Sequence, residues 1–127
     1  MKSKRERGQV IAEAAVMLPV LVFIALAMID IQWAVRDAAD VEYIVNEGAR
    51  CEAIGSLSCP NKDATLNYVQ TLAANMRLSA NRLDVVVPQC SSTTCTVNMT
   101  YRFQPLGVWF PPITIFRIGT AAQPPPA

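Results

Sequence analysis

The stretch RGQVIAEAAVMLPVLVFIALAMID, residues 7–30, decides how this chain of 127 residues is organised. Arg7-Gly8 stands just before an apolar run, Val10–Ile29, whose one charged residue is Glu13. Twenty residues of helix span about 30 Å, the thickness of the hydrocarbon core of a bilayer. Residues 1–7 carry four basic side chains and one acid, which favours retention of this end in the cytoplasm. The stretch predicts a single membrane-crossing helix followed by an exported segment.

Composition excludes several classes of function. Eleven basic and ten acidic residues give a formal net charge of +1, whereas a nucleic-acid-binding protein needs a basic face. The chain has no histidine, and histidine is the commonest metal ligand and the commonest general base. We therefore expect no catalytic activity, no metal or other cofactor and no nucleic-acid partner.

Four cysteines follow the apolar run: Cys51, Cys59, Cys90 and Cys95. An even number of cysteines outside the membrane predicts two disulfides in an oxidising compartment. Three pairings are possible, and the local one, Cys51–Cys59 with Cys90–Cys95, is favoured because each bond closes a short loop. The alternative is a four-cysteine zinc site, which the spacing of Cys90 and Cys95 would fit.

The helical pattern continues beyond the apolar run. Small and apolar residues recur at helical spacing up to residue 49, with charged residues mostly on the other face. The pattern predicts one continuous helix from about Val10 to about Ile54, ended by Gly55. Its first half is apolar all round, and its second half is amphipathic, so we expect the second half to pack beneath a small head.

The head is predicted to contain a second helix and a small antiparallel sheet. The helix is expected from Asp63 to about Leu78, capped by Asn61 or Asp63. Alternating Val, Thr, Tyr and Phe predict strands over 82–89 and 96–103, joined by a hairpin turn from Cys90 to Cys95. A loop over 104–112 and a third strand over 113–118 follow, and Trp109 and Phe110 in this loop either cover the core or serve adhesion.

The fold class is therefore α+β, with a long N-terminal helix, a short helix and about three strands. The expected organisation is a leader at 1–8, a transmembrane and amphipathic assembly helix at 9–54, an exported head at 55–122 and a disordered, proline-rich tail at 123–127.

Glu13 is the residue most in need of an explanation. A carboxylate inside a membrane span costs roughly 2–4 kcal/mol, so something should compensate for it. If a peptidase cuts after Gly8, Glu13 of one chain can pair with the new terminal ammonium of Gln9 in a neighbour. The alternative is that the positive end of the helix dipole stabilises Glu13. Asp30, at the end of the run, either marks the outer membrane interface or makes a subunit contact.

These residues resemble a known family. Arg7-Gly8 and Glu13 five positions beyond the glycine, followed by an apolar run, are similar to the leader of type IV pilins and pseudopilins. The closer resemblance is to TadE-like proteins of tight-adherence pilus systems. It rests on Leu18-Pro19, Asp30 and the segment Asn46-Glu47-Gly48-Ala49-Arg50, and more weakly on Tyr101–Leu106.

The resemblance implies a minor pilin or pseudopilin that takes part in pilus assembly and surface adhesion. A prepilin peptidase would cut between Gly8 and Gln9, and the partners would be other pilin subunits and, indirectly, an assembly platform and its ATPase. Gln9 departs from the hydrophobic residue that often follows the cut, and its cyclisation would remove the amine that Glu13 needs. The implied location is the bacterial inner membrane, with a periplasmic head, or the pilus outside the cell.

Two other interpretations stay open. Ala25-Leu26-Ala27 after a basic start also fits a secretory signal, whose removal would release a soluble protein beginning at Met28. The alternative from another class is a monomeric periplasmic protein, anchored or released, that scaffolds other envelope components and never enters a filament.

Overall fold

The computed structural model describes residues 4–87, 90–91, 93–107 and 110–123. It consists of a long helix, α1 (Lys4–Ile54), a second helix, α2 (Lys62–Asn75), a short 3-10 turn, η1 (Ala80–Arg82), and three strands, β1 (Leu83–Val86), β2 (Thr94–Phe103) and β3 (Ile113–Ala122). The strands form an antiparallel sheet in the order β1-β2-β3. The α+β class with a long N-terminal helix, a short helix and a three-stranded sheet is confirmed.

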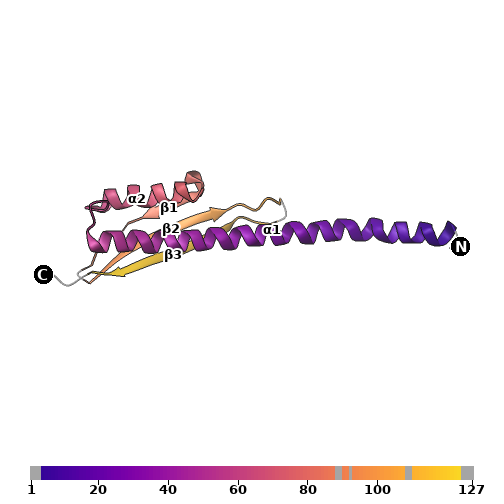
Figure 1. The fold of residues 1–127 in the computed structure, drawn as a ribbon, viewed down its shortest axis with the longest axis horizontal. Coiled ribbons are helices and arrows are strands. Elements are labelled where there is room, and N and C mark those ends of the chain that lie inside the picture. Colours follow the sequence, from indigo (N-terminus) through magenta and orange to yellow (C-terminus); the bar gives the residue numbers. More distant parts are fainter. Residues whose placement is uncertain (1–3, 88–89, 92, 108–109, 124–127) are drawn as a thin grey trace.

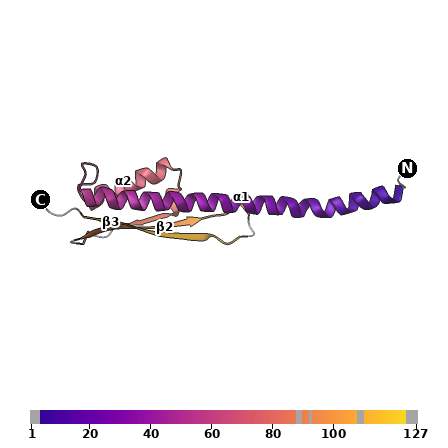
Figure 2. The same ribbon diagram turned by 60° about the horizontal axis from the view of Figure 1, so that its bottom comes forward.

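The long helix divides into a projecting half and a packed half. Figure 1 shows the N-terminal half of α1 extending well beyond the rest of the molecule, while its C-terminal half lies along the sheet. Figure 2 shows both helices on the same side of the sheet, with the other side uncovered. The 51 residues of α1 give a rod about 77 Å long, more than twice what a bilayer core needs.

The helix begins earlier than predicted and ends where predicted. It starts at Lys4 rather than near Val10, because lysine, arginine and glutamate are good helix formers and extend an existing helix at little cost. It ends at Ile54, and Gly55 follows with a φ of 60°. That left-handed backbone is the conformation in which glycine commonly terminates helices.

The second helix has clear signals at both ends. Asn61 is the N-cap, and its Oδ1 accepts a hydrogen bond from the N–H of Ala64 at 2.8 Å. The helix ends at Asn75, before the predicted Leu78, because Arg77 has a φ of 63°. The N–H groups of Arg77 and Leu78 then bond to the carbonyls of Ala74 and Ala73, which is the Schellman arrangement.

The strand boundaries differ from the sequence-based ones. β1 stops at Val86, and the next residues of the predicted strand, Pro88 and Gln89, lie outside the described residues. β2 starts at Thr94 and not at Thr96, so Cys95 belongs to the strand, opposite Ala121, while the predicted antiparallel connection between the first two strands is confirmed. β3 runs on to Ala122 because residues 119–122 pair with the early part of β2. Most of the predicted tail, residues 124–127, lies outside the described residues, and so does Trp109.

The core lies between the sheet and the packed half of α1. Alternate residues of β2, from Cys95 to Phe103, are buried and face the helices. They meet Val41, Ile44, Val45 and Ala49 of α1 and Val69 and Ala73 of α2. The expectation that the amphipathic half packs beneath a small head is therefore confirmed.

Candidate functional site

The predicted processing site lies on the first turns of α1. The backbone at Gly8 and Gln9 is helical, and Gln9 and Glu13 are four residues apart, which is one helical turn. Glu13 is exposed on the projecting half of the helix. Glu13 and Asp30, the two residues predicted to act in assembly, stand at opposite ends of the apolar run, about 26 Å apart along the axis. They therefore belong to two separate places on the molecule.

The projecting half of α1 exposes large apolar side chains on every face. Ile11, Val16, Leu18 and Leu21 are all more than half exposed. By length and composition this helix can cross a membrane. None of the described residues of the head covers most of this surface, so it requires either lipid or the helices of other proteins around it.

Asp30 is buried at the junction between the two halves. It is 7% exposed, and its Oδ1 accepts a hydrogen bond from the backbone N–H of Leu106 at 3.0 Å. The contact joins the helix to the loop between β2 and β3, 76 residues further along the chain. Asp30 thus has a hydrogen-bond partner within its own chain. Neither of its two predicted roles, marking the membrane interface or contacting another subunit, included this bond.

The loop between β2 and β3 extends down beside the apolar run. The ring of Phe110 stacks on that of Phe23, with centroids 6.5 Å apart. A groove of about 320 Å³ begins beside Phe110 and runs between α1 and the sheet toward the C-terminal end of α1. Its lining is almost entirely apolar. Asp30 contributes to this groove together with Ala34, Phe103 and Ile115.

The packed half of α1 depends on two close backbone approaches. Gly48 lies against α2, where a Cβ atom would come within 2.6 Å of Val69 Cγ2. Gly119 of β3 lies under α1, where a Cβ atom would stand 2.1 Å from the carbonyl oxygen of Val45. Gly48 belongs to the Asn46–Arg50 segment, so one reason for a small residue in that motif is that α2 packs directly on it.

The structure joins the four cysteines in two disulfides, Cys51–Cys59 and Cys90–Cys95. The first closes the loop between α1 and α2, and the second ties the start of β2 to the residues just before it. This is the sequence-local pairing. Since all four sulfurs are in disulfides, they do not offer the thiolates that a zinc site requires.

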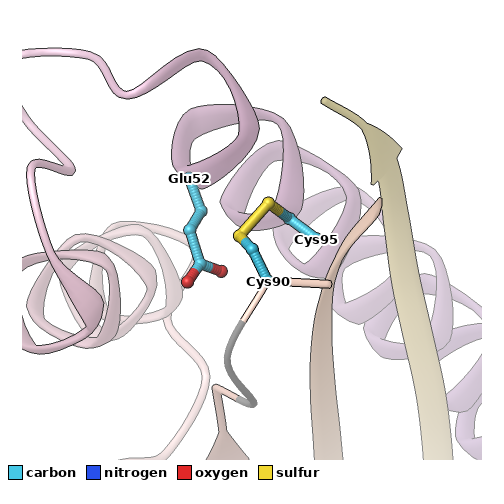
Figure 3. Close-up of side chains that lie close together, drawn as sticks. All are labelled: Glu52, Cys90 and Cys95. Carbon is cyan, nitrogen blue, oxygen red and sulfur yellow. A yellow bond between two sulfur atoms is a disulfide. The ribbon is translucent and has the colours of Figure 1, made fainter. Parts of the chain in front are cut away.

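One carboxylate lies against the second disulfide. Figure 3 shows Glu52 directed toward Cys90 and Cys95, and its nearer oxygen and the two sulfurs lie within 4.8 Å of one another. Burial raises the pKa of Glu52, and the charge of Lys62 acts in the opposite direction. Its Oε2 atom is buried with no hydrogen-bond partner among the described residues. Because the two sulfurs are joined in a disulfide, Glu52, Cys90 and Cys95 pack against one another at the edge of the head and do not offer the ligands of a metal site.

Sequence reasoning missed three of these features. A glycine inside a strand is a recognised sign of a close backbone approach, but Gly119 lay one residue beyond the predicted strand, 113–118, so the sign was missed. The hydrogen bond from Leu106 to Asp30 and the Phe23–Phe110 stack had no sequence signal, because each joins residues far apart in the chain.

Comparisons with known proteins agree with the geometry of α1. Residues 8–50 match the family model described as TadE-like protein, and this segment covers almost all of the helix. Neither the comparison with curated proteins nor that with solved structures gave a match. This match suggests a protein associated with tight-adherence pili, and the apolar helix is a candidate membrane anchor. Residues 8–50 of this chain, about a third of its length, are thus similar to the TadE-like family.

Proposed function

We propose that this protein is a minor pilin or pseudopilin of a tight-adherence pilus, which a prepilin peptidase cuts between Gly8 and Gln9 and which acts in pilus assembly and surface adhesion. The observation that carries the proposal is the division of α1. Its TadE-like helix projects an uncovered apolar rod from a small folded head. A rod of this kind suits a subunit that leaves the bilayer to join other apolar helices.

The proposed topology follows from charge and disulfides. Basic residues before the apolar run favour a cytoplasmic N-terminus. Two disulfides in the head suit the oxidising periplasm. In this arrangement the peptidase acts at the cytoplasmic face, and an assembly platform with its ATPase then extracts the subunit. The chain contributes packing and charge pairing to assembly and carries out no reaction.

Glu13 has the central part in this mechanism. In the membrane its carboxylate is costly, and that cost falls when it pairs with the terminal ammonium of Gln9 in a neighbouring subunit. Such a pair fixes the axial register of neighbouring subunits, because it forms only when the two helices stand at one relative height.

The first experiment determines the N-terminus of the mature protein by mass spectrometry of material from the native host. A chain beginning at Gln9, or at its methylated or cyclised form, supports the proposal. A chain beginning at Met28 points instead to a secreted periplasmic protein, and an intact Met1 points to an anchored envelope scaffold outside the filament.

The second experiment compares Glu13→Ala with Glu42→Ala, which removes an exposed glutamate from the packed half of the same helix. Both variants should insert into the membrane. Glu13→Ala should reduce the amount of subunit in sheared pili, and Glu42→Ala should not. Equal incorporation of both variants would contradict the pairing mechanism.

A further inference from the structure

The loop between β2 and β3 lies beside the apolar run and not beyond its outer end. Phe23, on which Phe110 stacks, is six residues before Ile29, the last residue of the run. At the rise of an α-helix this places the contact about 9 Å inside the run. If Val10–Ile29 crosses a bilayer, part of the head therefore lies below the outer surface of the hydrocarbon core.

The described tip of this loop consists of Pro105, Leu106, Gly107 and Phe110, and none of these carries a charge. Leu106 is 65% exposed and Phe110 is 43% exposed. A second, smaller groove lies between the loop and the helix, and it is lined by Leu106, Gly107 and Phe110 together with Phe23, Leu26, Ala27 and Asp30. The apolar surface of the rod is thus continuous with an apolar surface on the head.

The polar groups around this tip are arranged as a membrane interface requires. Irregular backbone in an apolar medium needs partners for its N–H groups, and the N–H of Leu106 donates to the buried Asp30 carboxylate at 3.0 Å. Directly behind the tip, two exposed arginines, Arg82 and Arg102, border a more polar groove, and Arg82 Nη2 donates to Gln104 Oε1 at 2.8 Å. Arginines at this level are placed to meet lipid phosphates.

We propose that Pro105, Leu106, Gly107 and Phe110 form a membrane-contact loop that inserts into the outer leaflet of the bilayer and sets the depth of the head. The occupant of this apolar surface is lipid, with Arg82 and Arg102 at the headgroups. Asp30 keeps the loop in place by binding its backbone. The inference rests on the proposed membrane insertion of α1 and adds a second point of attachment to it.

The test measures depth in a bilayer by spin labelling. Leu106→Cys, Ile24→Cys and Leu57→Cys are each labelled in the full, oxidised chain, whose own cysteines are all in disulfides. The chain is placed in phosphatidylethanolamine–phosphatidylglycerol vesicles at about one molecule per vesicle, so that only lipid can cover the loop. Leu57, fully exposed at the far end of the head, is the matched leucine control.

The expected result is that collisions of the Leu106 label with oxygen, which concentrates in the bilayer, exceed those with a water-soluble nickel chelate several-fold. The Ile24 label should show the same preference more strongly, and the Leu57 label the reverse. A Leu106 label that behaves like the Leu57 label while Ile24 stays in lipid would overturn the membrane-contact loop and leave the proposed span intact. An Ile24 label open to nickel would overturn both. Phe110→Cys repeats the measurement if the first label disturbs the loop.

Discussion

The two halves of α1 differ in how their apolar side chains are arranged and in what surrounds them. Large side chains of the projecting half are exposed, with Ile24 at 44% and Leu18 at 65%, whereas Val41, Ile44 and Val45 of the packed half are fully buried. One uninterrupted helix therefore meets two different solvents. The packed half is stabilised by the sheet of its own chain, and the projecting half depends on something outside the chain.

The difference follows the pattern of apolar residues along the helix. The projecting half is apolar all round, whereas the packed half has its buried residues on one face, and the sheet is placed against that face. The glycines at positions 48 and 119 permit that placement, because they let α2 and β3 approach the helix more closely than a side chain would allow. The projecting half requires no such approach within the chain.

The largest expected effect comes from closing the gap between the packed half and β3. Gly119→Ala would place a methyl group 2.1 Å from the carbonyl oxygen of Val45. Two backbones would have to separate, so we expect a loss of more than about 4 kcal/mol, which is among the largest effects of single substitutions. The measurement is chemical unfolding of the full chain in mild detergent.

Gly55→Ala is the control for Gly119→Ala. In the part of the chain that the structure describes, nothing lies within 4 Å of a Cβ atom placed at Gly55, whose φ is 60°. This variant has only backbone strain to overcome, about 1–2 kcal/mol. If both variants lost the same stability, the close packing of α1 on β3 would not be what matters at Gly119.

Replacing one isoleucine by alanine in each half of α1 tests whether only the packed half stabilises the head. Ile44→Ala removes fully buried groups and should lower the free energy of unfolding of the head by about 2–5 kcal/mol. Ile24→Ala, in the projecting half, should leave the unfolding of the head unchanged. A similar loss for both variants would mean that the two halves do not differ in the way described above.

A smaller effect is expected at the boundary between the halves. Asp30→Ala leaves the N–H of Leu106 without its acceptor, which should cost about 1–3 kcal/mol. The direct measurement is hydrogen–deuterium exchange at Leu106, which should become faster, while Asp30→Asn, which keeps an oxygen acceptor, should show a smaller change. Unaltered exchange in Asp30→Ala would rule out the anchoring role of this carboxylate.

The smallest effect is a pH dependence from Glu52. Burial raises the pKa of Glu52 above its ordinary value, so the folded state keeps this proton to a higher pH than the unfolded chain does. The contribution is most favourable below the unfolded-state pKa and is lost as the pH rises through the folded-state pKa. Glu52→Gln should remove this slope and change stability at pH 7 by at most about 0.5 kcal/mol.

The measurement for Glu52 is the difference in unfolding free energy between the variant and the natural chain from pH 4 to pH 8. Glu42→Gln, at an exposed position on the same helix, should not reproduce the change in slope. A Glu52→Gln variant whose advantage did not grow with pH would show that this carboxylate is not effectively buried.

Local chemistry explains why much of the fold could be predicted. The apolar run, the stop at Gly55 and the Asn61 cap each act through neighbouring residues, so the C-terminal end of α1 and the start of α2 followed from them. The end of α2 did not, because Arg77 adopts a left-handed backbone that its residue type does not announce. The extension of β3 to Ala122 was also not predicted, because it depends on pairing with the early part of β2.

The candidate site divides in the same way. The amino-acid pattern determined the long helix, its apolar half, the positions of Gly8, Glu13 and Asp30, and the family resemblance of residues 8–50. These are matters of spacing along one helix, which periodicity fixes. Only the tertiary structure decided that Asp30 holds the Leu106 backbone and that Phe110 reaches Phe23. Those contacts join distant segments, and their geometry depends on how the sheet is seated on α1 by its glycines.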